Sequence, residues 1–252
     1  MSLPVEVTSL GRFARAALES GDARVIAVFE RSAYVETLAG LACLGTVGNG
    51  PLNARCDLVF DNLAVGDFIS TDVKSAVTWR PSPAPEWNAS TVRASLVRLC
   101  AQVGLRLPSA GFGFVIDSAR SQPPAIEALQ RWLVDPIGNP EGASGLIGLG
   151  PGLTPSGDDL IGGAMCALHA TGRVAQAKRL AAWVLPLART ATNRISHAHL
   201  ACAAEGECGE AVNAAIVALL AGDAPNLESI DAIGHTSGWD ALAGVTLALG
   251  AN

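Results

Sequence analysis

The spacing of apolar residues changes character near residue 80. Before that point, apolar and polar positions alternate in short runs, which is typical of β-strands with one buried face. These runs occupy residues 24–29, 33–38, 41–47, 56–60, 68–71 and 76–79. Because the strands and their connections are short, we expect an antiparallel sheet or a small barrel of about six strands. An amphipathic helix at residues 8–19 is expected to precede the sheet.

A proline-rich segment at residues 80–86 separates this region from one with helical spacing. Each proline removes a backbone donor and disfavours helix in the residue before it, so this segment is the best candidate for a domain boundary. We predict a β-rich half at residues 1–85 and a mainly helical half at residues 86–252, which makes the fold α+β. Helices are expected at residues 88–103, 124–134, 154–171, 174–190, 192–205, 207–221, 226–233 and 237–250, and a small strand at 111–116.

One glycine-rich segment, Gly148-Leu-Gly-Pro-Gly-Leu-Thr-Pro-Ser-Gly-Asp-Asp159, leads directly into a predicted helix. Thr154 is a suitable N-cap, and Pro155 suits the first helical position, where its missing N–H costs nothing. The free N–H groups and partial positive charge of a helix N-terminus attract anions. Asp158 and Asp159 nevertheless fall in the first turn, so a ligand bound here must tolerate carboxylates beside it.

The last predicted helix repeats the chemistry of this segment. Ser156-Gly157-x-Asp159 followed by Gly163 corresponds to Ser237-Gly238-x-Asp240 followed by Gly244. One interpretation is that these are two well-capped helices whose glycines permit close helix contact. The other is that both helix starts face one small anionic or amide-bearing ligand. The second interpretation predicts that the starts at Ser156 and Ser237 lie close together and face one pocket.

Two arrangements reconcile an anion site with nearby carboxylates. A Mg²⁺ ion that bridges the carboxylates and the ligand cancels the repulsion, since hard cations prefer oxygen ligands. Alternatively, the carboxylates accept hydrogen bonds from an –NH₂ group while loop N–H and hydroxyl groups hold the anionic end, as a carbamoyl compound allows. Both arrangements stay open at this stage. His235 lies inside the repeated motif and is either structural or a proton carrier, because the ordinary pKa of histidine is near neutrality.

Other polar clusters have a structural and a functional interpretation. Thr192 and Ser196 open a predicted helix, either as capping groups or as a further wall of the ligand site. The spacing of His197, His199, Cys202 and Cys208 resembles a zinc motif, but the two histidines point about 200° apart on a helix. We therefore expect packing rather than metal binding from these four residues. No P-loop, dinucleotide fingerprint or nucleophile elbow occurs in the sequence.

The composition excludes several classes of protein. Half of the 252 residues are hydrophobic and 16% are charged, which supports a large core. The net charge of −6 and the absence of Lys/Arg clusters disfavour nucleic-acid binding. No apolar run approaches the ~18 residues of a membrane span, and no signal peptide is recognisable. Because the six cysteines show no framework spacing, we expect a reduced, cytoplasmic protein.

The glycine-rich segment at 148–159, Thr192-Asn-Arg-Ile-Ser196 with the residues that follow, and Gly234-His-Thr-Ser-Gly-Trp-Asp240 together resemble the AllH family. The resemblance covers roughly residues 145–250. It implies a subunit of the oxamate carbamoyltransferase of anaerobic allantoin degradation, a branch of purine catabolism, with other carbamoyltransferase subunits as partners. The implied reaction is phosphorolysis of oxalurate to oxamate and carbamoyl phosphate, or its reverse. Asn193 departs from the pattern, where Thr or another small polar residue is expected.

The resemblance and the repeated motif together assign roles to individual residues. His235, Asp159 and Asp240 are the predicted catalytic residues, with His235 moving a proton and the aspartates accepting carbamoyl –NH₂ protons or binding Mg²⁺. The predicted ligand-binding residues are Gly150, Gly152, Thr154, Ser156, Gly157, Asp158, Thr192, Ser196, Thr236, Ser237 and Gly238. No protein-bound cofactor is expected, with Mg²⁺ as the open exception. Two alternatives remain: a Mg²⁺-dependent hydrolase built on Asp158, Asp159 and Asp240, and a non-catalytic ligand-binding or scaffolding subunit.

Overall fold

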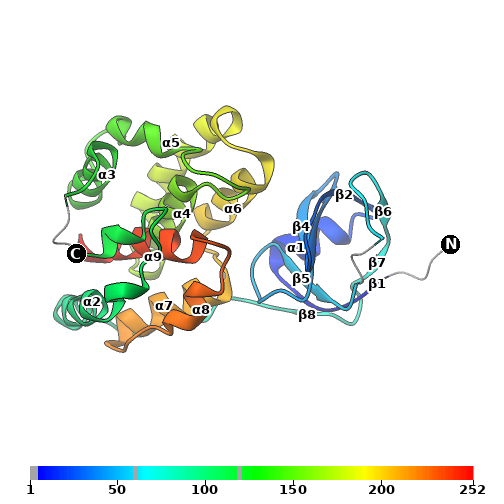
Figure 1. The fold of residues 1–252 in the computed structure, drawn as a ribbon, viewed down its shortest axis with the longest axis horizontal. Helices are drawn as coiled ribbons and strands as arrows, with labels where there is room; N and C mark the ends of the chain where they lie inside the picture. Colours follow the sequence, from blue (N-terminus) through cyan, green and yellow to red (C-terminus); the bar gives the residue numbers. More distant parts are fainter. Residues whose placement is uncertain (1–4, 59–61, 118–120, 252) are drawn as a thin grey trace. The chain divides into compact units, whose positions relative to one another are not determined.

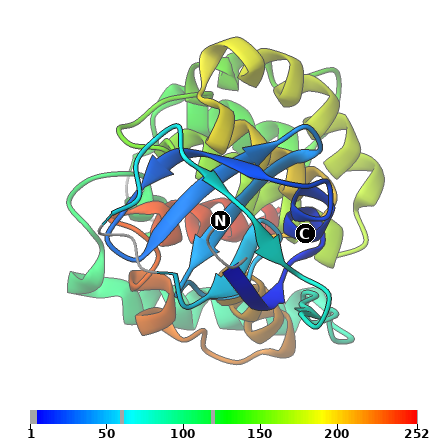
Figure 2. The same cartoon turned by 90° about the vertical axis from the view of Figure 1, so that its right-hand side faces the viewer.

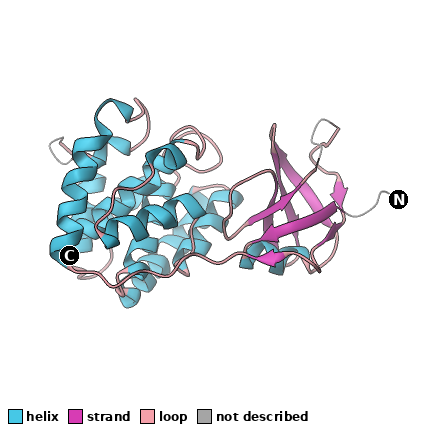
Figure 3. Ribbon diagram, turned by 90° about the horizontal axis from the view of Figure 1, so that it is seen from below, coloured by secondary structure: helices cyan, strands magenta, loops and turns pink. Residues whose placement is uncertain are grey.

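The computed structural model describes residues 5–58, 62–117 and 121–251, which form two compact units. The first unit comprises Met1–Pro81 and the second Ser82–Asn252 (Figure 1). Each unit has a hydrophobic core made only of its own residues. The α+β class is confirmed, since strands occupy the first unit and helices the second (Figure 3). The division falls four residues before the predicted boundary at Pro85.

The first unit is a mixed sheet that curls into a half-barrel (Figure 2). Its strands follow the order β6-β2-β3-β4-β5-β1-β7, with β8 also paired to β1. Their bounds are β1 (Val5–Leu10), β2 (Ala23–Val28), β3 (Ser32–Thr37), β4 (Gly40–Gly45), β5 (Asn53–Cys56), β6 (Phe68–Ile69), β7 (Thr71–Asp72) and β8 (Val77–Thr78). The half-barrel agrees with the barrel-like form that we expected, but the pairing is mixed rather than antiparallel, because β4–β5, β1–β7 and β1–β8 pair in parallel.

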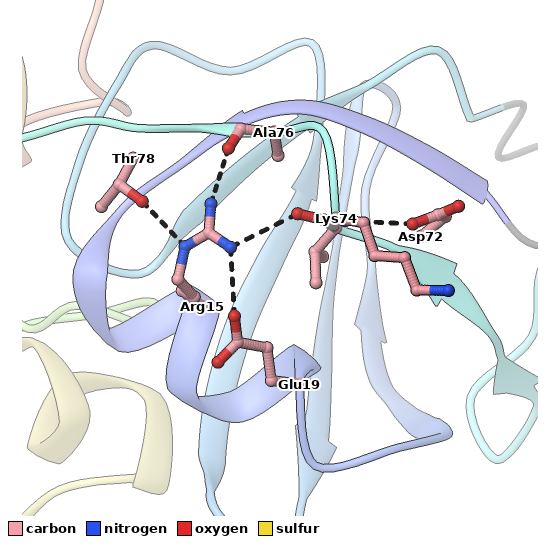
Figure 4. Close-up of polar contacts among 7 residues, drawn as sticks. Arg15, Glu19, Asp72, Lys74, Ala76 and Thr78 are labelled. Carbon is pink, nitrogen blue, oxygen red and sulfur yellow. Dashed lines mark hydrogen bonds and ion pairs between the residues drawn. The ribbon is translucent and has the colours of Figure 1, made fainter.

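Helix α1 (Arg12–Leu18) is tied to the segment that follows β7 by one arginine (Figure 4). The Arg15 guanidinium donates to Thr78 Oγ1 at 2.8 Å and to the carbonyl oxygens of Ala76 at 2.6 Å and Val73 at 3.3 Å. It also forms an ion pair with Glu19 at 3.1 Å. A guanidinium matches several acceptors at once because its donors lie in a fixed plane. The contacts therefore orient α1 while its apolar face enters the core.

Two sequence expectations in this unit need correction. The helix predicted at 8–19 is a strand as far as Leu10, and the helix begins only at Arg12. Leu10 satisfied the helical pattern, but its backbone pairs with Ala54 of β5, a long-range contact that local periodicity does not report. The strand predicted at 56–60 lies earlier, at Asn53–Cys56, and residues 59 and 60 lie outside the described residues.

The second unit consists of helices. The α-helices are α2 (Ala89–Val103), α3 (Pro124–Val134), α4 (Ser156–Ala170), α5 (Val174–Ala191), α6 (Arg194–Ala204), α7 (Glu210–Ala221), α8 (Leu227–Asp231) and α9 (Ser237–Gly250). Three short 3₁₀ helices are η1 (Gly104–Arg106), η2 (Gly113–Ile116) and η3 (Glu141–Leu146). The small strand predicted at 111–116 is wrong, because this apolar run is η2 and packs on α9.

Helix α9 lies at the centre of the second unit and packs most extensively against α4 (Figure 1). Its other neighbours include α2, α3, α7, α8 and η2. The strongly apolar character of α4 and α9 reflects this position, since a helix surrounded by others is hydrophobic on most faces. Within the described ranges, no helix is long and apolar enough to cross a bilayer.

Candidate binding site at the paired starts of α4 and α9

The two repeated motifs pack against each other through reciprocal glycine contacts. A Cβ atom at Gly163 would clash with the backbone oxygen of Ala241 in α9, and a Cβ atom at Gly244 would clash with the backbone oxygen of Leu160 in α4. Leu160 and Ala241 are themselves equivalent positions of the two motifs. The α4–α9 contact is therefore approximately two-fold symmetric, and the close helix contact predicted for these glycines is confirmed.

The glycine after each serine also has a packing function. Gly157 and Gly238 are buried, and a Cβ atom there would clash with the backbone oxygens of Leu146 and Ile230, respectively. At the start of each motif, another segment of backbone therefore packs directly against the glycine. Packing alone explains why glycine occupies these two positions, so a direct ligand contact for Gly157 or Gly238 stays a prediction.

The first turns of the two helices meet at a pair of hydroxyl groups. Thr154 Oγ1 and Ser237 Oγ lie 2.8 Å apart and share a hydrogen bond. The expected proximity of the two helix starts is therefore observed. The N-cap predicted for Thr154 is not observed. Helix α4 begins at Ser156, Pro155 takes the N-cap position, and no side chain caps the helix. Thr154 uses its hydroxyl to contact the other motif instead.

Asp240 is completely buried behind these hydroxyls, with an exposed fraction of 0%. Its Oδ1 accepts a hydrogen bond from the backbone N–H of Phe112. Its Oδ2 is buried and has no hydrogen-bond partner among the described residues. An unpaired buried acceptor is costly, of the order of 1–3 kcal/mol, so this oxygen is a natural position for a ligand donor.

Asp159 lies beside Asp240, and one oxygen of its carboxyl group likewise lacks a hydrogen-bond partner among the described residues. Its Oδ2 is also buried without a partner in the part of the chain that the structure describes. Burial raises the pKa of Asp159 well above its ordinary value, the nearby carboxylates of Asp240 and Asp158 raise it further, and hydrogen bonds from Ser237 and Thr154 oppose the shift. The Asp159 carboxyl is therefore more easily protonated than a surface aspartate. Each motif therefore contributes one buried carboxyl oxygen that has no partner among the described residues.

Asp158 differs from its neighbour because both of its oxygens are engaged. Oδ1 accepts from the backbone N–H of Gly148 at 2.8 Å, and Oδ2 accepts from the hydroxyl of Ser196 at 2.6 Å. Asp158 and Ser196 are both buried. These predicted ligand-binding residues thus connect the glycine-rich loop to α6, and their direct contact with a ligand stays a prediction.

Asn193, which the sequence marked only as a departure, has a clear structural role. Its Oδ1 accepts from the backbone N–H groups of Ile195 at 3.0 Å and Ser196 at 3.1 Å, which caps α6. Its Nδ2 donates to the backbone oxygen of Leu153 at 2.8 Å. The preference for asparagine at helix N-caps was the available signal. Asn193 therefore holds the glycine-rich loop from the other side.

The loop itself depends on glycine for its conformation. Gly148, Gly150 and Gly152 have φ values of 72°, 124° and 91°, which L-residues with side chains rarely adopt. A Cβ atom at Gly150 would also lie only 2.7 Å from the backbone nitrogen of Ser156. Gly150 and Gly152 are exposed at the tip of the loop, beside the first turn of α4. The loop thus offers backbone rather than side chains to a ligand.

The remaining predicted residues lie around this core. His235 is exposed in the turn before α9, and Thr236 is the N-cap residue of α9 but makes no side-chain cap. Thr192 follows α5, and its Oγ1 is buried without a partner among the described residues. The roles predicted for these three residues stay predictions.

A metal site is the other arrangement that the sequence leaves open for these residues. Within residues 5–58, 62–117 and 121–251, no group of three or more His, Cys, Asp or Glu side chains is arranged to hold a metal ion. The cysteines and histidines that resemble a zinc motif are packed instead. Cys166 forms a hydrogen bond with Cys208, and burial lowers the pKa of His199 to about 4.

A separate groove of about 950 Å³ lies elsewhere on the helical unit, beside α3. Its lining comes from α3 and the segment that follows, including Trp132, Asn139 and Glu141. None of the predicted site residues lines it. The paired starts of α4 and α9 remain the candidate site because each motif contributes one buried carboxyl oxygen without a partner among the described residues, Asp159 Oδ2 and Asp240 Oδ2.

Comparison with known proteins identifies the same region. Residues 146–249 match a family model described as oxamate carbamoyltransferase subunit AllH. The matched segment includes both motifs, the loop and helices α4 to α8, and it ends within α9. Neither a curated protein nor a solved structure matches the chain.

Proposed function

We propose that the chain works as a subunit of the AllH family of oxamate carbamoyltransferases, whose family model matches residues 146–249, and that the paired starts of α4 and α9 bind the carbamoyl-bearing substrate of that enzyme. The observation that carries this proposal is the pair of buried, unpartnered oxygens on Asp159 and Asp240, next to the Thr154–Ser237 hydrogen bond. A carbamoyl group supplies the N–H donors that these acceptors lack.

The proposed reaction is phosphorolysis of oxalurate to oxamate and carbamoyl phosphate, or its reverse. The bond between the carbamoyl carbon and the oxamate nitrogen breaks, and a bond between that carbon and a phosphate oxygen forms. The proton on hydrogen phosphate is transferred overall to the oxamate nitrogen. Such a transfer needs orientation and charge stabilisation more than a covalent nucleophile.

Each group has a proposed task in this reaction. Asp159 and Asp240 orient the –NH₂ of the carbamoyl group through their free oxygens. His235, exposed in the turn before α9, carries the proton from phosphate to the leaving nitrogen. The exposed loop at Gly150 and Gly152, together with Ser156, faces the anionic end of the substrate. Asp158, Ser196 and Asn193 hold the loop in place.

A family of enzyme subunits implies partner chains, so the activity test uses the complex. Carbamoyl phosphate formation from oxalurate and phosphate is measured for the chain purified with its co-encoded subunits. We expect D159N to reduce the rate about 100-fold or more without loss of complex assembly. The exposed Asp223 provides a matched control, since D223N removes a surface carboxyl only. Wild-type activity in D159N would overturn the assigned site.

Ligand binding by the isolated chain gives a second test. Thermal shifts are recorded with oxamate, oxalurate, carbamoyl phosphate, phosphate and Mg²⁺ for the wild type and for the S156A/S237A double variant. The proposal expects oxalurate or carbamoyl phosphate to stabilise the wild type more than the variant. Stabilisation by Mg²⁺ alone would instead favour a metal-dependent hydrolase, and equal shifts in both proteins would reject a site shared by the two motifs.

A further inference from the structure

The segment that contains Gly111 and Phe112 covers the carboxyl group of Asp240. It lies outside the residues that match the family model and contains neither repeated motif. The Phe112 backbone N–H donates to Asp240 Oδ1 across 128 positions of sequence. The 3₁₀ helix that follows, η2, packs on α9, which keeps the segment in position. Asp240 is therefore held by a part of the chain unrelated to the α4–α9 pair.

Gly111 allows this contact to form. A Cβ atom at this position would lie 2.5 Å from Oδ1 and 2.9 Å from Oδ2 of Asp240, and 3.0 Å from Cβ of Thr236. The φ of Gly111 is also +74°, in the left-handed region. Any side chain at Gly111 must displace the Asp240 carboxyl or the backbone. The position is restricted both by its conformation and by its contact with the carboxyl group.

We infer that Gly111 and Phe112 form a third wall of the site, beside the starts of α4 and α9, and that they act as positioning residues for Asp240. The inference rests on the proposed function. With Oδ1 held by Phe112, Asp240 presents a single oxygen, Oδ2, to a ligand. Asp159 also has one unpartnered oxygen, Oδ2.

This arrangement defines the chemical class of the group that binds. Two separate single acceptors suit the two hydrogens of one primary amide or ureido –NH₂. They suit a guanidinium less well, because its fork pairs best with both oxygens of one carboxylate. The site is thus built for the –NH₂ end of a carbamoyl compound.

The hydrogen bond from Phe112 can be tested without any ligand. Selective ¹⁵N-phenylalanine labelling of the full chain gives few amide signals, since the sequence has six phenylalanines, and a Phe112→Leu variant assigns the one of interest. We expect hydrogen exchange at Phe112 to be about tenfold or more faster in D240A, and to stay slow in D240N, whose side chain keeps an acceptor oxygen. Exchange that is equally fast in the wild type and in D240A would overturn the inference.

The positioning role is tested with oxalurate as the probe, because it carries the carbamoyl –NH₂ and does not react in the absence of phosphate. G111A adds a methyl group against the Asp240 carboxyl, and G172A is the matched control because Gly172 has a φ of +78° with no atom near the added Cβ. Both variants bear the same backbone strain. We expect the dissociation constant for oxalurate to rise about tenfold or more in G111A and to stay unchanged in G172A.

The possible outcomes separate this inference from the proposed function. If the wild type binds neither oxalurate nor carbamoyl phosphate, the proposed function fails and the positioning role fails with it. If the wild type binds oxalurate and G111A binds it equally well, only the third wall is rejected. Equal weakening in G111A and G172A would assign the effect to backbone strain and would also reject the third wall.

Discussion

Asp158 and Asp159 are neighbours in the first turn of α4, yet their carboxyl groups have opposite environments. Asp158 accepts two hydrogen bonds, from Gly148 and Ser196, and has no acceptor atom left over. Asp159 has a buried oxygen without a partner among the described residues and a raised pKa caused first by burial. At the scale of single residues, Asp158 connects the glycine-rich loop to α6, whereas Asp159 keeps one oxygen without a partner in the described part of the chain, which is why we propose it as the group that contacts the ligand.

The raised pKa of Asp159 predicts a specific pH dependence of stability. The folded protein binds the Asp159 proton more tightly than the unfolded chain, so its contribution to stability is complete below the ordinary value of 3.8 and is lost as pH rises through the folded pKa. We expect D159N, which cannot ionise, to remove this loss. Denaturant unfolding of both proteins between about pH 4 and 8 measures it. A difference in unfolding free energy that does not change with pH would contradict the raised pKa.

The two hydrogen bonds to Asp158 predict a large effect on stability. D158A would leave the Gly148 N–H and the Ser196 hydroxyl without their acceptor, which costs about 3 kcal/mol of unfolding free energy. S196A removes only one donor and is expected to cost about 1 kcal/mol. Chemical denaturation of the two variants gives both values. Equal costs would show that the loop does not depend on Asp158.

At the scale of elements, the structure is organised by the contact between α4 and α9. Their glycines at positions 163 and 244 bring each helix against the backbone of the other. The same contact places Thr154 beside Ser237 and Asp159 beside Asp240. Packing and the candidate site are thus consequences of one approximately two-fold arrangement.

Adjacent glycines in α4 provide a matched test of this contact. An alanine at Gly163 would meet the backbone of α9, and we expect G163A to lose about 2 kcal/mol or more of unfolding free energy. At Gly162 the added Cβ would lie 3.6 Å from Cβ of Ala203, an ordinary contact. G162A should be neutral or gain up to about 1 kcal/mol from helix propensity. Thermal and denaturant unfolding of both variants compare them; similar losses would contradict the α4–α9 geometry.

The helices were largely predictable because their signals are local. The prediction of 124–134 coincides with α3, and the starts and ends of α5 and α9 were predicted to within one residue. The strands were less predictable, since β1 pairs with β5, β7 and β8 through contacts far apart in sequence. Short connections suggested hairpins, but β4 and β5 pair in parallel.

The whole molecule consists of two units with separate cores. The core of the second unit begins at Val92 and contains no residue from the first. All residues of the candidate site, including Gly111 and Phe112, belong to this unit. A unit of this size with its own core is expected to fold by itself.

This organisation predicts the behaviour of a fragment. Residues 82–252 expressed alone should be helical and unfold in one cooperative transition. Far-ultraviolet circular dichroism and denaturant titration measure both properties. A fragment that lacks a cooperative transition would show that the helical unit needs the first unit to fold.

The candidate site was predictable from the sequence only in part. The repeated motif predicted that the helix starts at Ser156 and Ser237 lie close together, because equivalent chemistry recurs at equivalent helical positions. The residue that contacts Ser237 is Thr154 rather than Ser156, which the motif did not indicate. Phe112 was not predictable, since its contribution is a backbone N–H and its partner is 128 residues away. No pattern of side chains in the sequence indicates a backbone contact of this kind. The third wall could therefore be recognised only from the fold.

The most direct test of the central claim is a crystal structure of the chain with oxalurate bound. The account predicts that the terminal carbamoyl nitrogen of oxalurate lies within hydrogen-bond distance of Asp159 Oδ2 and Asp240 Oδ2, with its carboxylate toward the loop at Gly150 and Gly152. Oxalurate bound elsewhere on the chain, while both oxygens stay unpartnered, would contradict it.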